Sequence, residues 1–527
     1  MQIKTKIMLA RQNGENKLKV NTSNKSVKKS ISTPSGKVKV AWSKEEKTTS
    51  MGGLVYFTQF LDATGLFEYW IKTCPLIYGS NNAHSPRDIL GTILLSILNG
   101  HTRYGHITTL RGESLSSGLL KMEKIPSEES IRRGLCKLVE ETTQEDWVRE
   151  NFDKMSHGLL ETSWIMDVDV TIKTIYGKQD RAEIGYNPHK PGRPSHAYHS
   201  FWIGKLRFCL GVEVHSGNKT AGSYGLDFIK KWFQRHPPSQ HPSFIRGDIG
   251  YGTEKWMSSL EEENIHYLFK LRQTRKVKEL INLIEIQNKW TPTEEKWMCS
   301  ESEICLSGWS KSRRVVVYRR IHILSNSKGK PCVKLIGSGD KGFLPLEILE
   351  ENDVKYEYAI YITDLALDKE LIGPSYRDRG DNENCYDELK NQWGWGGFKV
   401  SDLARCQLMA STIALIYNWW SVFVKFVDND VAREAITSRP LFLNHVARST
   451  IEQRQRVIKL FCAHGFVDKI QEKLQDASDL LTRWMTLTAE QLKQQTIWSR
   501  IILHIIKNHK KLGIKRTLLH QFMGEFL

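Results

Sequence analysis

The stretch from residue 163 to residue 270 most constrains the fold, because its residues change from a helical to a strand-like pattern. Three segments rich in β-branched and aromatic residues, separated by turn-forming residues, predict three strands in succession. These segments are 163–177, 196–204 and 206–217. A helical pattern at 226–235 follows, and "SFIRGDIGYG" and "IHYLFKLR" then predict two further strands. We therefore expect an α/β core built around a sheet.

The charge balance favours a polyanionic partner. Lys and Arg number 76 against 59 Asp and Glu, so the formal net charge is +17. An excess of this size is typical of proteins that bind polyanions, and it disfavours an acidic substrate of ordinary size. Nucleic acid is the leading candidate.

The cysteines and the apolar segments indicate the compartment. Nine cysteines occur without a C-x-x-C pair, which suggests neither a disulfide framework nor a zinc site and favours a reducing compartment. The first 20 residues contain no apolar segment of the kind that secretion signals have. Residues 408–424 are apolar, but 17 residues that include Ser, Thr and Asn predict a buried core helix rather than a membrane span. We expect a cytoplasmic protein with no membrane partner.

Changes in composition divide the chain into regions. Residues 1–50 carry 12 Lys or Arg against three Glu, which predicts a basic disordered tail. The other expected regions are a helical N-terminal region that binds DNA (51–155), the first part of the core (156–272), a β-rich insertion (273–355), the second part of the core (356–425) and a helical C-terminal region (426–527). The element order of the core is that of a ribonuclease H-like α/β fold. In the N-terminal region, Ser127 predicts the start of a helix with Arg132 and Arg133, either presented to DNA or simply amphipathic.

Carboxylates occur at the ends of two predicted strands. In "IMDVDVTIK" the period of two puts Asp167 and Asp169 on one face of the strand. Two carboxylates on an apolar strand are unfavourable unless they are paired or bind a metal, although such a pattern is also common in turns and on surfaces. Asp248 lies in "RGDIGYG", where the glycines allow a phosphate to approach the backbone closely. The alternative for Asp248 is an Asp that caps a turn.

The segment "YRDRGDNENCYDELK", residues 376–390, predicts a helix with Ser375 as its N-cap. At about 100° per residue, one face of this helix carries a ring, a guanidinium, two carboxylates and an ammonium. These side chains are Tyr376, Arg379, Glu383, Asp387 and Lys390. The set suits a base, phosphates and a metal ion, and the competing interpretation is a solvated helix with an Arg379–Glu383 ion pair.

The segment 185–199 lies between predicted strands and supplies Lys190, Arg193 and three histidines. The histidines, His189, His196 and His199, have no Cys or Glu partner pattern that would support a zinc site. We expect a loop in which Lys190 and Arg193 contact DNA phosphates.

Tyr376, Arg379, Glu383 and Lys390 have the spacing of the YREK signature of insertion-sequence DDE transposases. The segments around Asp169 and Asp248 resemble the first and second Asp regions of the thirteen-eighty family of insertion sequences. The resemblance covers roughly residues 55–430, and it implies a ribonuclease H-like core with a β insertion between the second Asp and the Glu.

The resemblance implies a role for each matched residue. Asp169 matches the first catalytic Asp, because Thr171 follows in the family's D-x-T arrangement, and Asp167 remains its rival. Asp248 and Glu383 match the other two catalytic carboxylates. Tyr376, Arg379 and Lys390 take DNA-contacting roles. Three carboxylates suit two Mg²⁺ ions, for which Mn²⁺ can substitute.

The resemblance also implies cut-and-paste transposition in a prokaryotic, nucleoid-associated setting. The protein would bind the terminal inverted repeats of its element as a homodimer and join the ends to target DNA. Two alternatives remain open, a DNA nuclease without strand transfer and a non-catalytic DNA-binding regulator derived from a transposase.

Overall fold

The computed structural model describes residues 29–40, 47–80, 82–161, 163–188, 190–204, 206–218, 221–293, 296–321, 356–429, 431, 433–462, 465–492 and 495–508. The chain separates into two compact units, Met1–Lys47 and Thr48–Leu527. In the first unit, β1 (Lys29–Thr33) and β2 (Gly36–Val40) form an antiparallel hairpin. The expected disorder of the tail therefore does not hold for residues 29–40. Gly36, at φ +111°, ends the turn between the two strands. Residues 1–28 and 41–46 lie outside the described residues.

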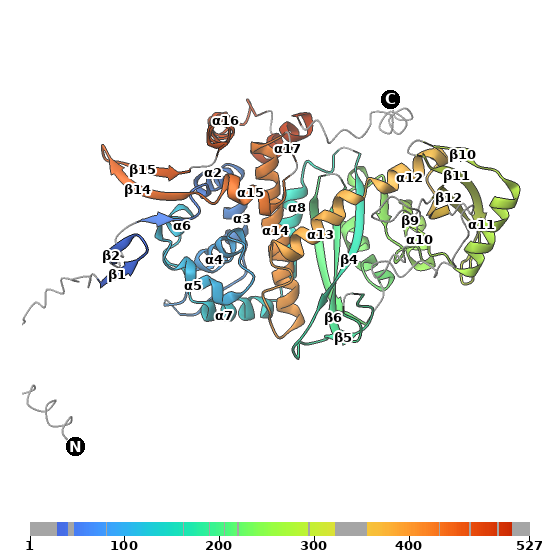
Figure 1. Cartoon of the computed structure of the whole chain (residues 1–527), viewed down its shortest axis with the longest axis horizontal. Helices are drawn as coiled ribbons and strands as arrows, with labels where there is room; N and C mark the ends of the chain where they lie inside the picture. Colours follow the sequence, from blue (N-terminus) through green and yellow to red (C-terminus); the bar gives the residue numbers. More distant parts are fainter. Residues whose placement is uncertain are drawn as a thin grey trace, which may run out of the picture. The chain divides into compact units, whose positions relative to one another are not determined.

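The second unit has mixed α/β structure centred on a ten-stranded sheet (Figure 1). Along the sheet the strands follow the order β10-β11-β12-β13-β9-β8-β4-β6-β5, and β7 also pairs with β6. Their bounds are β4 (Ile165–Thr174), β5 (Glu183–Ile184), β6 (Pro194–Ile203), β7 (Phe208–Ser216), β8 (Phe244–Gly247), β9 (His266–Lys270), β10 (Thr291–Pro292), β11 (Met298–Ile304), β12 (Arg313–Ile321) and β13 (Tyr356–Thr363). The five strands and the helix predicted between residues 163 and 270 are confirmed as β4, β6, β7, α9 (Leu226–Arg235), β8 and β9.

The segment expected to form a separate β subdomain instead extends the central sheet. Within 273–355, the structure describes α11 (Arg275–Gln287), β10, β11 and β12, and residues 322–355 lie outside the described residues. β12 pairs along its length with β13, which itself pairs with β9 of the core. Without β12, one edge of β13 would be unpaired and would expose its backbone hydrogen-bonding groups, so the pairing satisfies these groups.

Seven helices, counted over the described part of residues 54–156, form the N-terminal region. They are α2 (Leu54–Thr64), α3 (Leu66–Lys72), α4 (Pro86–Leu98), α5 (Ile107–Leu110), α6 (Ser114–Leu119), α7 (Glu128–Glu140) and α8 (Gln144–Ser156). The predicted start of α7 is confirmed, because the Ser127 side chain accepts a hydrogen bond from the Ser130 amide at 3.2 Å.

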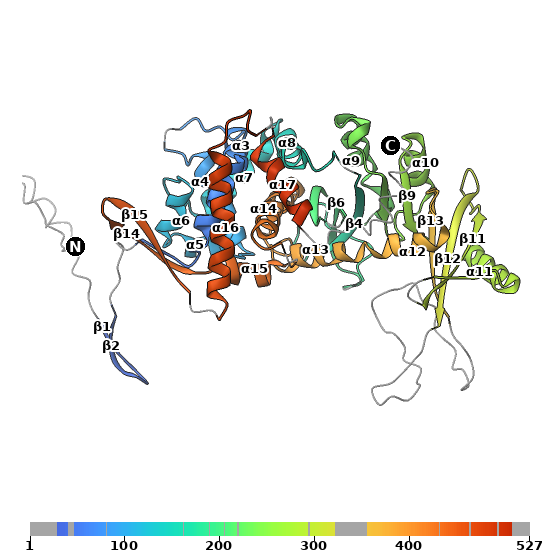
Figure 2. The ribbon, with the colours of Figure 1, turned by 90° about the horizontal axis from the view of Figure 1, so that it is seen from above.

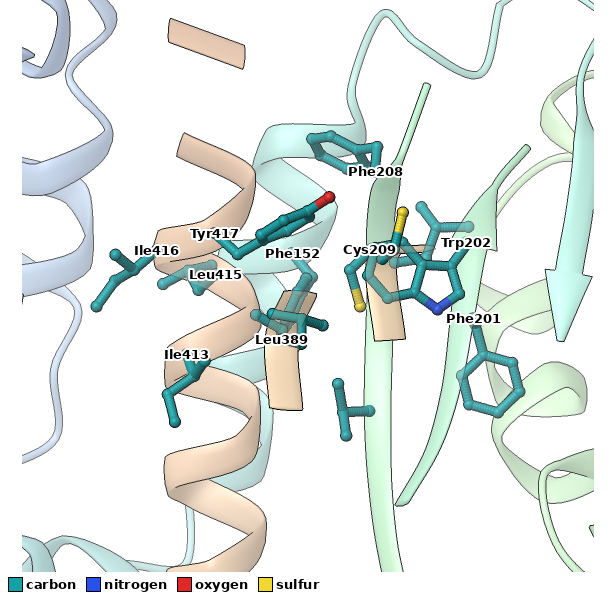
Figure 3. Close-up of a cluster of buried hydrophobic side chains, with 14 of the residues drawn as sticks. Phe152, Phe201, Trp202, Phe208, Cys209, Leu389, Ile413, Leu415, Ile416 and Tyr417 are labelled. Carbon is teal, nitrogen blue, oxygen red and sulfur yellow. The ribbon is translucent and has the colours of Figure 1, made fainter. Parts of the chain in front are cut away.

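The long helix α14 (Leu403–Val427) lies between these N-terminal helices and the sheet (Figures 1 and 2). Its length and composition would suit a membrane span, but 94% of its most apolar window is buried inside the protein. The predicted buried core helix is thus confirmed. Figure 3 shows its Tyr417 pointing toward the neighbouring strands, which carry Trp202 and Phe208.

Two polar side chains of α14 complete the hydrogen bonding of β7. Asn418 accepts from the Cys209 amide at 2.9 Å and donates to the Cys209 carbonyl at 2.7 Å. Gln407 makes the same kind of paired contact with the Val214 amide and the Val212 carbonyl, both at 2.6 Å. These contacts explain why polar residues are tolerated on so apolar a helix, since buried backbone groups need partners.

We expect Asn418→Ala to lower the free energy of unfolding by about 2–4 kcal/mol, because it leaves a buried amide and a buried carbonyl of Cys209 without partners. Urea denaturation of the purified protein measures this effect. Ala404→Ser, at an exposed position near the start of the same helix, is the control and should change stability by less than about 0.5 kcal/mol. Equal stability of the two variants would contradict the role given to Asn418.

The C-terminal region, expected to be all helical, also contains a hairpin. β14 (Val446–Glu452) and β15 (Gln455–Phe461) pair along their length, and β14 also pairs with β3 (Thr48–Thr49). Gln453 and Arg454, with φ of 49° and 63°, form a two-residue hairpin turn. The basic composition of this segment did not indicate a turn, so the hairpin was not predicted. The helices described here are α15 (Ala435–Phe442), α16 (Val467–Met485) and α17 (Ile497–Asn508).

Candidate active site

Asp169 and Asp248 lie on neighbouring parallel strands. β4 and β8 run parallel with Asp167 opposite Arg246, and each strand reaches its candidate carboxylate two residues further on. Asp169 is partly exposed, and its Oδ1 accepts from the Val170 amide at 2.8 Å. Asp248 directly follows β8, and its Oδ1 accepts from the Gly250 amide at 2.9 Å. The parallel pairing thus places both carboxylates at the level where β8 ends, beside the middle of β4.

Asp167, the rival of Asp169, is engaged in a buried ion pair. Arg246 donates from Nε to Oδ1 of Asp167 at 2.6 Å and from Nη2 to Oδ2 at 2.7 Å. Both side chains are buried, with exposed fractions of 0% and 1%. Gly204 makes room for the pair, because a Cβ there would lie 2.9 Å from both side chains. Both oxygens of Asp167 therefore accept hydrogen bonds from one buried guanidinium.

Arg246 also reaches the helix that precedes the signature. Its Nη1 donates to the backbone carbonyl of Ser375 in α12 (Lys369–Arg377). One buried guanidinium thus connects three segments of the chain. In each segment, a candidate site residue lies no more than four residues after the residue that the guanidinium joins. These pairs are Asp169 after Asp167, Asp248 after Arg246, and Tyr376 and Arg379 after Ser375.

Arg379 pairs with Asp169. Its Nη2 lies 2.7 Å from Oδ2 of Asp169 and 3.4 Å from the Val168 carbonyl, and the Arg379 side chain is 5% exposed. Burial lowers the pKa of Arg379, but Asp169 together with Tyr376, Tyr386 and Asp167 outweighs this effect, and the pKa is raised well above its ordinary value. Arg379 is therefore a permanent positive charge beside a candidate metal ligand.

Three tyrosines border the carboxylates. Burial raises the pKa of Tyr376, Arg379 lowers it, and Asp248 and Asp169 raise it further. Burial followed by Asp169 raises the pKa of both Tyr251 and Tyr386 well above its ordinary value. All three phenols are consequently neutral at physiological pH. Tyr251 and Tyr386 were not predicted, although Tyr386 lies on the same helical face as Arg379, Glu383 and Lys390.

The signature segment is two helices rather than one. α12 ends at Arg377 and α13 (Gly380–Asn391) begins three residues later, so Ser375 is a buried residue inside α12 and the prediction that it is an N-cap was wrong. Pro374 lies inside α12, which runs through it. Just before the proline, the Tyr318 hydroxyl accepts from the Gly373 amide at 2.7 Å and donates to the Lys369 carbonyl, so it bridges two backbone groups one turn apart.

Glu383 lies on α13 one turn after Arg379, but its side chain is outside the described part of the chain, as are those of residues 381 and 382. Among the described side chains, no group of three His, Cys, Asp or Glu could hold a metal ion. Asp169 and Asp248 supply the hard oxygen donors that Mg²⁺ prefers, so the donor set suits this ion if Glu383 completes it.

The remaining candidates lie away from this cluster. Lys390 is at the far end of α13, where it lines a pocket of about 910 Å³. Lys190 and Arg193 are exposed in the loop before β6, whose turn is held by the Asn187 side chain accepting from the Lys190 amide at 3.1 Å. His196 and His199 are buried in β6, and burial lowers the pKa of His199 to about 3. His189 lies outside the described residues.

The chain belongs to the family described as transposase DDE domain group 1, whose family model matches residues 34–477. It is a DDE transposase, and the family's chemistry is the cleavage and transfer of DNA strands. Among solved structures, the chain is similar to the cryo-EM structure of a piggyBac transposase synaptic complex with hairpin DNA, with 10% identity, 85% of each chain covered and a TM-score of 0.36. No curated protein matches the sequence.

Proposed function

We propose that this transposase moves its own insertion sequence by cut-and-paste transposition, with Asp169, Asp248 and Glu383 as its catalytic, metal-binding carboxylates. The observation that carries the proposal is that the parallel strands β4 and β8 place Asp169 and Asp248 at the same level, where β8 ends, with Arg379 against Asp169. The pairing of both Asp167 oxygens with the buried Arg246 supports the choice of Asp169 over Asp167. The order of β4, β6, β7, α9, β8 and β9 supports a ribonuclease H-like core.

Each residue has a task that its environment supports. Two Mg²⁺ ions, or Mn²⁺ in their place, would supply charge neutralisation at the attacking and leaving oxygens of an in-line displacement. Asp169, Asp248 and Glu383 would hold them through carboxylate oxygens. Arg379 is a fixed cation that would neutralise a DNA phosphate beside Asp169. Tyr376, neutral and mostly buried, would pack against the DNA at the cut.

The same proposal covers partners and setting. The protein would bind the terminal inverted repeats of an element of the thirteen-eighty type and would bring two ends together as a homodimer on double-stranded DNA. Lys190, Arg193 and Lys390 are proposed to contact that DNA. The protein would act in the cytoplasm of a prokaryote, at the nucleoid.

A cleavage and joining assay tests the proposal. Wild type and Glu383→Gln are incubated with Mg²⁺ and DNA that contains the gene's own flanking sequences, and products are separated on a denaturing gel. We expect end-specific cuts and joined products from wild type, and binding without either product from the variant. Cuts without joining would favour a nuclease, and binding without cuts by both proteins would favour a non-catalytic regulator.

A further inference from the structure

The pocket that Lys390 lines is strongly basic. It has a volume of about 910 Å³ and lies between the turn at 102–106, α7 and the end of α13 with the residues that follow it. Four cations line it, Arg103, Arg132, Lys390 and Lys399, against the single carboxylate of Glu128. Within the described chain, no ion pair involves any of these four cations. The pocket therefore has positive charge that the fold itself does not neutralise.

Arg132 is held in a position suited to an anion. Its guanidinium lies over the ring of Tyr104, 4.4 Å from the centroid, and Tyr104 is buried. Cation–π attraction to this ring holds the guanidinium at the pocket, and its fork of N–H donors can bind a phosphate in a bidentate manner. The next residue, Arg133, differs, because its side chain is 78% exposed and pairs with Glu129.

Close backbone contacts join the two sides of the pocket. The Phe398 amide donates to the Thr102 carbonyl at 2.6 Å, and a Cβ on Gly397 would lie only 2.1 Å from that carbonyl oxygen. Lys173 of β4 donates from Nζ to the Gly397 carbonyl at 2.9 Å. The helical N-terminal region and the strand of Asp169 are thus joined at this pocket.

The separation between the pocket and the candidate carboxylates can be estimated along two elements, β4 and α13. Along β4, Lys173 is four residues from Asp169, or roughly 13 Å. Along the helix, Lys390 is eleven residues from Arg379, or roughly 16 Å. The two estimates agree, and a duplex that rises about 3.4 Å per base pair covers this separation in roughly four or five base pairs.

The basic surface continues beyond the pocket. The ring of Tyr176 is 61% exposed, and both Lys399 Nζ and the Arg193 guanidinium lie over it, at 5.9 Å and 5.6 Å. Lys399 therefore connects the pocket to the loop of Arg193.

We propose that this pocket is a binding site for the DNA backbone, in which Arg103, Arg132 and Lys399 act with Lys390 on phosphates roughly four or five base pairs from the cleaved bond. The inference rests on the proposed function, because it takes the substrate to be DNA cut near Asp169. It assigns to α7 the role of holding the strand at a fixed distance from the carboxylates.

The test measures the affinity for a 40-base-pair duplex from the DNA that flanks the gene, over a range of salt concentrations. The double variant Arg132→Gln/Lys399→Gln should bind roughly tenfold or more weakly. The slope of log affinity against log salt should also become shallower by about 0.9 for each phosphate that the variant no longer neutralises. Arg133→Gln on the same helix is the matched control and should keep the wild-type affinity. Equal slopes for the double variant and Arg133→Gln would overturn the proposal.

A second measurement fixes the position. A neutral methylphosphonate at one phosphate, roughly four or five base pairs from the cut, should weaken binding by wild type and leave the double variant unaffected. An identical profile for both proteins would reject the pocket while wild-type cleavage still supports the proposed function. Conversely, binding without cleavage by wild type would reject the proposed function, and the salt slopes would still decide the pocket.

Discussion

Arg246→Met is expected to abolish DNA cleavage and to lower the free energy of unfolding by about 3–5 kcal/mol. The variant leaves Asp167 as a buried charge without its guanidinium and frees the Ser375 carbonyl from the strands. Asp169, Asp248 and Arg379 all lie within four residues of the three groups that Arg246 joins, so their relative placement should be disturbed as well. Urea denaturation and the rate of end cleavage measure the two effects.

The double variant Asp167→Leu/Arg246→Met separates positioning from stability. Replacing a buried ion pair by apolar side chains often restores or improves stability, so we expect most of the unfolding free energy to return. Cleavage should remain lower by about 10²-fold, because the link to α12 is still absent and small displacements of reacting groups have effects of this size. Wild-type cleavage by a stable double variant would show that Arg246 does not position the site.

Asp248→Asn is expected to lower the rate of DNA cleavage by at least about 10³-fold while changing the free energy of unfolding by less than about 0.5 kcal/mol. The Asn side-chain oxygen can still accept from the Gly250 amide, so the turn after β8 keeps its hydrogen bond. What the variant lacks is the negative charge that a divalent cation needs in its ligand. Single-turnover cleavage at saturating protein, together with urea denaturation, checks both expectations.

The comparison with Asp167→Asn provides the control, since the two substitutions are chemically identical. Asp167→Asn weakens a buried pair and should reduce stability, in contrast to Asp248→Asn. If Asp248→Asn cleaved DNA at the wild-type rate, Asp248 would not be a metal ligand.

Local patterns were sufficient to predict the strands of the core but not every helix boundary or strand pairing. β4, β6, β7, β8 and β9 were predictable because each combines β-branched and aromatic residues between turn formers, whereas the two-residue β5 was not predicted. α12 was missed because it continues through Pro374, a residue that ordinarily ends or kinks a helix. The pairing of β12 with β13 was also beyond local pattern, since strand partners are chosen by tertiary packing.

For the candidate site, the sequence supplied the acidic residues and the signature, while the structure supplied their partners. Periodicity placed Asp167 and Asp169 on the same face and could not distinguish them. Arg246, which lies 79 residues from Asp167 in the "RGDIGYG" segment, pairs with Asp167, and this contact required tertiary structure. Arg132 was considered as a DNA-facing residue, but its stacking on Tyr104 and its position beside Lys390 required tertiary structure.

The hydroxyl of Tyr318 inside α12 has a consequence for how this protein can vary. Tyr318 belongs to β12, within the segment that enters the chain between β9 and β13, yet its hydroxyl bonds to two backbone groups of the helix that leads to the signature. The segment is therefore not an interchangeable module. Its removal or exchange, in evolution or by design, would also require a new partner for the backbone groups of Lys369 and Gly373.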